Sequence, residues 1–348
     1  MTTDSSSGLT LIRSNDLIIY YLYDLIMSYR PPYELTIEIF NQLKSIIRLI
    51  GQIEGYQLLQ NNLQLRRENK IRSLHSSLAI EGNTLTEAQM TDIIEGKRVL
   101  GPTKDILEVK NAIKVYDQLE EIDPFAESEL LRMHETLMHG LIDDAGQYRQ
   151  KAVGVLDGEK VVHIAPPAKR VPALMGDLFE HLNEYQEDTI IKSCVFHYEF
   201  EFIHPFSDGN GRMGRLWQTA ILKTEYPDLV VIPLENMVYA RQEEYYRALQ
   251  DSQSVGNSTP FILYALSALE DTLKQQLDQA TNLKSDPESR LRSFRASQKG
   301  AFFSRKEYLS IHKQISPATA TRDLSFGLER GLLIRKGQYA TTRYQFLV

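Results

Sequence analysis

His204-Pro-Phe-Ser-Asp-Gly-Asn-Gly-Arg-Met-Gly-Arg215 is the most informative stretch of the chain, because it combines a histidine, an aspartate, a glycine-rich turn and two arginines. Glycines that free the backbone N–H groups and lead into a helix predict an anion-binding nest at the positive end of the helix dipole. Asp208 can hold a hard divalent cation against the same phosphates. Arg212 and Arg215 lie three residues apart and can face one polyphosphate. The stretch therefore predicts a nucleotide triphosphate site, although Gly-Asn-Gly alone favours an ordinary turn before an amphipathic helix.

The pattern His-x-Phe-x-Asp-Gly-Asn-Gly-Arg-x-x-Arg resembles the signature of the Fic family at every defining position. Proteins of this family mostly transfer AMP from ATP onto a hydroxyl side chain of a target protein. The resemblance implies a mostly α fold, with a Fic-type helical core and a β-hairpin flap. It also implies ATP as substrate, Mg²⁺ as cofactor, and a partner protein that offers a Ser, Thr or Tyr hydroxyl.

In such a reaction an oxygen attacks the α-phosphorus while pyrophosphate leaves, so positioning and charge neutralisation dominate the barrier. The resemblance implies that His204 takes the proton from the attacking hydroxyl, a task that suits an imidazole near neutral pH. It implies that Asp208 coordinates Mg²⁺ between the α and β phosphates. Phe206 is expected to anchor the loop in the core. The residues expected to hold phosphate oxygens, through backbone N–H groups, a side-chain amide and guanidinium groups, are Gly209, Asn210, Gly211, Arg212 and Arg215.

A second stretch, Ser77-Leu-Ala-Ile-Glu81-Gly82-Asn83, resembles the inhibitory motif of the same family. On a helix, Ser77 and Glu81 fall on one face at i and i+4. Gly82 or Asn83 can end that helix in a left-handed conformation. The resemblance implies that Glu81 reaches Arg215 and displaces the γ-phosphate, as a competing anion. A solvated glutamate at a helix end is the alternative.

The dipeptide Asp157-Gly158 between two short apolar runs predicts a β-hairpin over residues 153–164, with Asp-Gly favouring a type I′ turn. The resemblance implies that this hairpin is a flap that pairs with the target segment by strand addition. A plain surface hairpin is the alternative. His163 is interpreted as a flap residue with an exposed ring and not as a second base. The residues assigned to target docking are Val162, His163, Ile164, Ala165 and Pro166.

Tyr245 and Tyr246 resemble the paired tyrosines that border the adenine in this family. Stacking on an aromatic ring holds a purine with little sequence demand. Tyrosines at helical spacing with a leucine are also typical of a protein core, so both interpretations stay open. The family often has an asparagine seven residues past the second tyrosine, where this chain has Gln253. The selectivity for the base is therefore in doubt.

The chain of 348 residues is long enough for two or three domains, and its net charge is −7. One cysteine, Cys194, excludes an internal disulfide and favours a cytoplasmic location. No apolar run approaches the roughly 20 residues of a membrane span, the run Leu17 to Met27 being interrupted by Asp24. We therefore expect no membrane partner, and a homodimer is the default expectation.

Helical periodicity extends from about residue 15 to residue 283, and Thr84 with Glu87 predicts a capping box for one of these helices. We expect a helical N-terminal extension over residues 1–70 and a Fic domain with its inhibitory helix over residues 71–281. A polar linker is expected over residues 282–289. A winged helix-turn-helix is expected over residues 290–348.

The last part of the chain is basic. Residues 290–348 contain twelve Lys and Arg against three Asp and Glu, a net charge of +9 that leaves −16 for the rest. The pattern predicts a helix over residues 304–312, a second helix from Ser316-Pro317 to Glu329, and a two-stranded wing. Thr319, Thr321 and Arg322 would lie at the front of the recognition helix. Such a unit can bind DNA or dock a protein, and the sequence favours neither.

The function that these patterns favour is Mg²⁺-dependent transfer of AMP from ATP to a protein hydroxyl, restrained by Glu81. Removal of AMP by water on the same fold is one alternative. A DNA-binding regulator whose Fic core senses nucleotide is another; the intact His204 argues against it and the basic C-terminal part argues for it.

Overall fold

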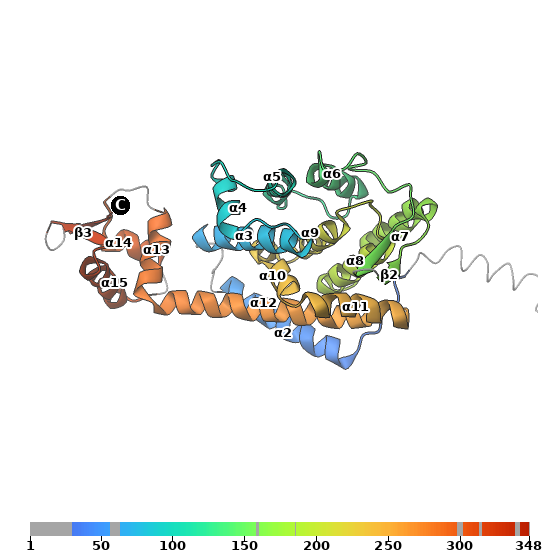
Figure 1. The fold of residues 1–348 in the computed structure, drawn as a ribbon. Helices are drawn as coiled ribbons and strands as arrows, with labels where there is room; N and C mark the ends of the chain where they lie inside the picture. Colours follow the sequence, from blue (N-terminus) through green and yellow to red (C-terminus); the bar gives the residue numbers. More distant parts are fainter. Residues whose placement is uncertain are drawn as a thin grey trace, which may run out of the picture.

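The computed structural model describes residues 30–55, 63–157, 160–184, 186–297, 302–312, 315–337 and 342–347. These residues are mostly helical, with two antiparallel strand pairs (Figure 1). The predicted fold class, a helical core with a hairpin, is confirmed in this respect. The elements before the C-terminal unit are α2 (Ile37–Gly55), α3 (Leu63–Ile80), α4 (Glu87–Ile94), α5 (Thr103–Asp117), α6 (Glu127–Met138), β1 (Gly154–Asp157), β2 (Lys160–Ile164), α7 (Val171–Glu184), α8 (Thr189–Ile203), α9 (Asn210–Leu222), α10 (Leu234–Ala240), α11 (Gln242–Val255) and α12 (Thr259–Ser285).

Helix α8 lies at the centre of the core and is buried on nearly all sides. Its N-terminus is capped by Asp188, whose carboxylate accepts hydrogen bonds from two backbone N–H groups. Phe196 and Phe200 join a hydrophobic cluster with α6, α7 and α9, while Val195 and Tyr198 join another with α2 and α12. A helix that is apolar all round must be covered on all faces, which agrees with the central place of α8.

Helix α3 packs against α5, α9 and α10 and ends beside the first turn of α9. It starts at Leu63, so the predicted domain boundary at residue 70 falls inside a continuous helix and cannot separate two parts there. The next helix, α4, is capped by Thr86 with Gln89, so the predicted capping box of Thr84 and Glu87 is wrong. Thr84 instead hydrogen-bonds Asp105 of α5 through both its backbone N–H and its hydroxyl.

Strands β1 and β2 form the predicted hairpin, in which Gly154 pairs with Ile164 and Asp157 pairs with Lys160. Asp157 is therefore a strand residue and not the first of the two loop residues, because its pairing with Lys160 leaves residues 158–159 to connect the strands. Those two residues lie outside the described part of the chain, so the predicted turn type stays a prediction. Just beyond the paired strands, the backbone N–H of Ala165 donates to the Val153 carbonyl at 3.3 Å.

The C-terminal unit comprises α13 (Pro287–Ser297), α14 (Arg305–Ile311), α15 (Pro317–Glu329), β3 (Leu333–Lys336) and β4 (Arg343–Phe346). Its helices begin at caps in the predicted places: Ser304 with Glu307 for α14 and Ser316 for α15. The unit has a hydrophobic core of its own. The order of elements agrees with the predicted one, and their assignment to a winged helix stays a prediction.

The predicted linker over residues 282–289 does not form an irregular segment. Helix α12 continues to Ser285 and α13 begins at Pro287, so Asp286 alone separates them. The carboxylate of Asp286 accepts a hydrogen bond from the Ser289 backbone N–H, which favours a new helix start directly after α12. Figure 1 shows the long α12 leading from the core to the C-terminal unit.

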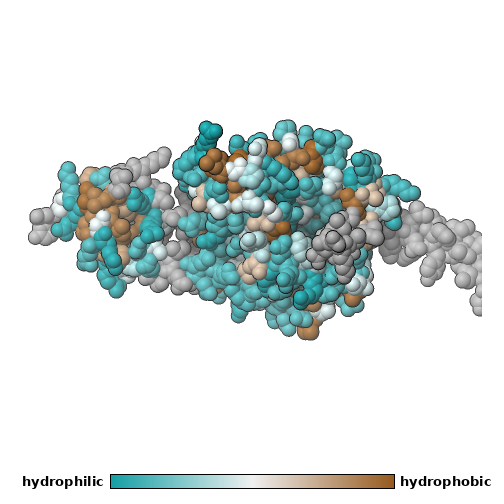
Figure 2. Space-filling view, in the orientation of Figure 1, coloured by the Kyte–Doolittle hydropathy of each residue, from teal (hydrophilic) through white to brown (hydrophobic). Residues whose placement is uncertain are grey.

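The visible face of the molecule is mostly hydrophilic, and apolar side chains gather on the C-terminal unit (Figure 2). Within the described residues, no helix has both the length and the apolar character that crossing a membrane requires. The apolar run from Leu17 to Met27 lies outside the described part.

Candidate active site

The C-terminus of α8 presents His204 to the loop that precedes α9. His204 caps α8 in a left-handed conformation, with φ of 51° and ψ of 61°. Its imidazole is one-fifth exposed, and Nδ1 lies 3.4 Å from the backbone carbonyl of Glu201. Among the described residues, His204 is the only non-glycine residue with a positive φ. The backbone must therefore be held there by its surroundings.

The loop after His204 is closed by Asn210, the first residue of α9. The Asn210 side chain accepts from the Phe206 backbone N–H and donates to the Phe206 carbonyl, both at 2.9 Å. Both residues are buried. The expected anchoring role of Phe206 agrees with this burial. The Asn210 amide thus closes the loop, and its expected contact with phosphate stays a prediction.

His134 of α6 supports the same loop, a role that no pattern in the sequence predicted. Its ring stacks on Phe206 with centroids 3.6 Å apart. Its Nδ1 accepts from the Gly146 backbone N–H at 2.9 Å, and Nε2 lies 3.0 Å from the Asp208 carbonyl. Burial lowers the pKa of His134 to about 4, so the ring is neutral at pH 7 and Nε2 carries the proton. His134 thereby fixes the backbone at Asp208.

Asp208 is the carboxylate that the loop exposes. Its side chain is 48% exposed, and Oδ1 accepts from the Gly209 backbone N–H at 2.6 Å and from Arg212 at 3.1 Å. No group of three His, Cys, Asp or Glu side chains in the described residues is arranged to bind a metal ion. Mg²⁺ is commonly held by one or two carboxylates together with substrate phosphates, so a single exposed carboxylate beside the N-terminus of a helix fits this ion.

The guanidinium of Arg212 lies in the interior, between Asp208 and Glu108 of α5. Nη1 lies 3.3 Å from the Glu108 carboxylate, which also accepts from the Asn83 side chain at 2.8 Å. The Nε atom of Arg212 is buried without a hydrogen-bond partner among the described residues. Glu108 was not predicted, because it lies 104 residues from Arg212 in sequence.

Arg215 meets the predicted inhibitory motif. Its Nη2 donates to the Glu81 carboxylate at 2.7 Å and to the Ser77 carbonyl at 3.0 Å. The Arg215 side chain is 2% exposed and that of Glu81 is 30% exposed. Gly82 ends α3 in the expected left-handed conformation, with φ of 86°. The structure thus brings together the residues that the sequence paired.

Gly211 lets Glu81 approach the first turn of α9. A Cβ atom at Gly211 would lie 2.5 Å from Oε1 of Glu81 and 2.9 Å from Nη1 of Arg215. The Glu81 carboxylate therefore occupies the space above the helix N-terminus, where an anion is favoured. A phosphate group that binds to Arg215 in this position must compete with Glu81.

Glu201 of α8 has a side chain that is 10% exposed, and no pattern in the sequence marked it as part of the site. Its Oε1 has no hydrogen-bond partner among the described residues and lies where a Cβ atom at Gly214 would come within 2.7 Å. Burial raises the pKa of Glu201 to about 8; the charge of Glu81 adds to this effect and that of Arg215 opposes it. Glu201 is therefore mostly protonated at neutral pH.

The two tyrosines that were expected to border the adenine differ in exposure, although their ring centroids lie 5.3 Å apart. Tyr245 is buried in the core, and its hydroxyl lies 3.1 Å from Nε2 of His197. Tyr246 is 47% exposed, and its hydroxyl accepts from Gln242 at 3.4 Å. Tyr245 is thus a core residue, Tyr246 alone of the pair offers an exposed ring, and the contact of the pair with adenine stays a prediction.

Of the flap residues, Val162, His163 and Ile164 are described by their backbone alone. His163 pairs with Val155, and Ile164 pairs with Gly154. The positions of these side chains lie outside the described part, so the exposed ring expected for His163 stays a prediction. Ala165 is buried, and the carbonyl of Pro166 accepts a hydrogen bond from Arg149.

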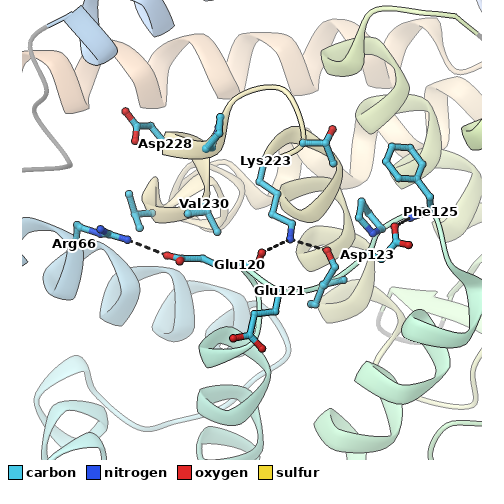
Figure 3. Close-up of a pocket in the computed structure, with 13 residues that line it drawn as sticks. Arg66, Glu120, Glu121, Asp123, Phe125, Lys223, Asp228 and Val230 are labelled. Atoms are coloured by element: carbon cyan, nitrogen blue, oxygen red, sulfur yellow. Dashed lines mark hydrogen bonds and ion pairs between the residues drawn. The ribbon is translucent and has the colours of Figure 1, made fainter.

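A hollow of about 630 Å³ lies at the other end of α9 (Figure 3). Lys223, at the C-terminal cap of α9, lines it and donates to the carbonyls of Glu120 and Ile122. None of the signature residues lines this hollow. A 13-residue helix is roughly 20 Å long, so the hollow is distant from His204 and is not the candidate site.

Comparison with known proteins identifies the family to which this chain is similar. The model of the Fic/DOC family matches residues 122–222. The crystal structure of a Fic family protein from Desulfovibrio desulfuricans G20 is 40% identical, with a TM-score of 0.72, over 92% of this chain and 98% of that chain.

Curated relatives include protein adenylyltransferase fic-1 of Caenorhabditis elegans, 28% identical over 64% of this chain and 45% of its own length. Protein adenylyltransferase Fic of Drosophila grimshawi is 30% identical over 61% of this chain and 44% of its own length. The chain thus spans about half the length of the curated relatives it matches.

Proposed function

The chain belongs to the Fic family, and we propose that it is a protein adenylyltransferase, which moves AMP from ATP to a Ser, Thr or Tyr hydroxyl of a target protein. Relatives that carry the name protein adenylyltransferase support this activity. The observation that carries the proposal is the junction of α8 and α9. There a capping histidine, an exposed carboxylate and two buried arginines meet at one helix N-terminus.

The proposed chemistry assigns each group a task. His204, whose backbone is left-handed and whose imidazole is partly exposed, accepts the proton of the attacking hydroxyl. The first turn of α9 donates backbone N–H groups to the phosphates, with Gly211 leaving room for close approach. The missing side chain of Gly209 instead leaves room for Met138 of α6. Asp208 would hold Mg²⁺, which supplies positive charge to the phosphate oxygens when bound.

We further propose that Glu81 restrains the enzyme. The 2.7 Å ion pair gives Arg215 a carboxylate partner in the place where a terminal phosphate would bind. Loss of Glu81 would leave a buried arginine without its carboxylate partner, and the phosphate of ATP would then meet an arginine ready to pair. Because Glu81 is partly exposed, it can leave without unfolding the core.

The proposal is tested by incubating a cell lysate with labelled ATP and the Glu81→Gly protein, followed by mass spectrometry of labelled proteins. Glu81→Gly combined with His204→Ala is the control, because it keeps the opened site and lacks the base. We expect AMP on hydroxyl side chains with the first protein and a loss of about 10²-fold or more with the second. Equal labelling by both proteins would exclude His204 as the base. AMP release from a modified target by the wild type would favour the reverse reaction.

For the C-terminal unit, we propose binding to DNA through α15. Thr321 and Arg322 are exposed and Thr319 is half-buried in its first turns, and the residues from 290 onward carry the net charge of +9. Exposed cations near a helix N-terminus suit contact with phosphates. An electrophoretic shift with the full chain tests this; absence of any shift at low salt would favour protein docking.

A further inference from the structure

The side chain of Arg149 has an unusual environment. It is 1% exposed, and it lies in the segment between α6 and β1. A buried arginine is usually paired with a carboxylate. Among the described residues, no carboxylate lies within ion-pair distance of Arg149, and its recorded hydrogen bonds go to backbone carbonyls. Several separate segments therefore share one buried cation.

Two of these carbonyls belong to the C-terminus of α8. Nε donates to the His204 carbonyl at 2.7 Å, and Nη2 donates to the Ile203 carbonyl at 3.2 Å. The last carbonyls of a helix have no partner within the helix and carry a partial negative charge. The backbone N–H of Arg149 also donates to the Pro205 carbonyl at 2.9 Å. Arg149 thus contacts the backbone of His204 and of the residues on both sides of it.

The other two carbonyls flank the hairpin. Nη1 donates to the carbonyl of Lys151, before β1, and Nη2 donates to that of Pro166, after β2, at 2.9 Å and 2.6 Å. One planar guanidinium group therefore ties both ends of the hairpin to the backbone of His204. Its fixed fork of donors can hold these segments at one spacing, which a flexible single-atom donor such as lysine cannot do.

We propose that Arg149 is a positioning residue, which holds His204 in its left-handed conformation and sets the spacing between this base and the hairpin. The inference rests on the proposed function, because it concerns the hydroxyl that the hairpin presents to His204. The left-handed backbone of a non-glycine residue is unfavourable by itself and persists where the surroundings enforce it. Arg149 provides that enforcement through hydrogen bonds to the backbone carbonyls of His204 and of the residues before and after it.

Hydrogen exchange of the full-length chain measures the anchoring without reference to activity. Arg149→Lys and Arg149→Met should both speed amide exchange in peptides that cover residues 150–166 and 203–206, and leave α7 and α12 unchanged. Arg290→Met is the matched control, since Arg290 is equally buried but pairs with Asp323 in the C-terminal unit. It should speed exchange in the C-terminal unit alone. Faster exchange spread evenly over the chain in Arg149→Lys, or no change near the hairpin, would overturn the proposal.

The rate of AMP transfer in the Glu81→Gly background measures how well Arg149 positions His204. Arg149→Lys should lower kcat for AMP transfer by about 10²-fold, because small displacements of a catalytic group have effects of that size. The Kd for ATP should change less than about threefold, a negligible free-energy difference, since Arg149 contacts none of the proposed phosphate-binding side chains. Guanidinium ion added to Arg149→Ala should restore part of the rate. A full rate in Arg149→Lys, or equal losses in kcat and ATP affinity, would refute positioning. Inactivity of Glu81→Gly itself would count against the proposed function, while the exchange result would still decide the anchoring.

Discussion

Glu108 and Arg212 form an ion pair inside the protein, with 3.3 Å between Oε1 and Nη1 and both side chains almost entirely buried. The second oxygen of Glu108 accepts from Asn83, the last residue of the stretch that resembles the inhibitory motif. One signature arginine is thus paired with a carboxylate that contacts the segment after Glu81. The other signature arginine, Arg215, is paired with Glu81 itself.

Removal of Glu108 should therefore destabilise the protein strongly. Glu108→Ala leaves the Arg212 cation buried with Asp208 as its remaining carboxylate, and breaking a buried pair in this way costs about 3–5 kcal/mol. Glu120→Ala is the control, because Glu120 pairs with Arg66 at 2.9 Å on the surface. That change should cost less than about 1 kcal/mol. Urea unfolding of both variants measures the difference, and similar losses would contradict the assigned role of burial.

Glu201 should make the stability depend on pH. Its pKa is about 8 in the folded protein against an ordinary value of 4.5, so between these values the folded state holds a proton that the unfolded chain has lost. Stability should then fall as pH rises from about 4.5 to about 8 and level off above that. Glu201→Gln removes this contribution. Its thermal midpoint should rise relative to wild type as pH increases across this range, and parallel pH profiles would contradict the pKa.

A glycine at position 211 should be required for Arg215 to pair with either Glu81 or a phosphate of ATP. In Gly211→Ala the added Cβ would lie 2.5 Å from Glu81 and 2.9 Å from Arg215, so the methyl group takes the space of either anion. We expect Gly211→Ala to transfer AMP no faster than the protein without this change. Its Kd for ATP should be at least about tenfold higher, a loss of about 1.4 kcal/mol in binding free energy. Titration calorimetry in the Glu81→Gly background measures this. Gly176→Ala on α7 is the control, since its Cβ meets no atom within 4 Å.

The C-terminal unit should show the salt dependence of a DNA-binding protein. Each phosphate contact adds about one unit to the slope of log K against log salt concentration, so Arg322→Ala should reduce the slope by roughly 1. Fluorescence anisotropy with a DNA duplex at several salt concentrations gives both slopes. An unchanged slope would show that Arg322 contacts no phosphate.

Local patterns in the sequence predicted much of this site. The signature placed the start of α9 and its two arginines, and the i and i+4 spacing placed Ser77 and Glu81 on one face. The caps Ser304 and Ser316 also lie where their side chains predicted a helix start. These features depend on neighbours within a few residues, so the sequence contains the relevant information.

Other features depend on contacts between distant segments. The guanidinium of Arg149 reaches a carbonyl 55 residues away, and Glu108 reaches an arginine 104 residues away. No local pattern marks either pair. The capping box at Thr84 failed for a related reason: Asp105 of the next helix takes up its hydroxyl and N–H. Likewise, Tyr245 was ambiguous because helical spacing cannot distinguish the core from a base pocket.

Arg215 has one of two partners, Glu81 or a phosphate of ATP, and the proposed restraint of the enzyme depends on this choice. The most direct test compares initial rates of AMP transfer for wild type, Glu81→Gly, Arg215→Ala and the double variant. Glu81→Gly should raise the rate by roughly 5- to 150-fold, the range of a coupling free energy of 1–3 kcal/mol. The same change should give no increase when Arg215 is already alanine. An equal increase in both backgrounds would show that Glu81 acts elsewhere and would contradict the account.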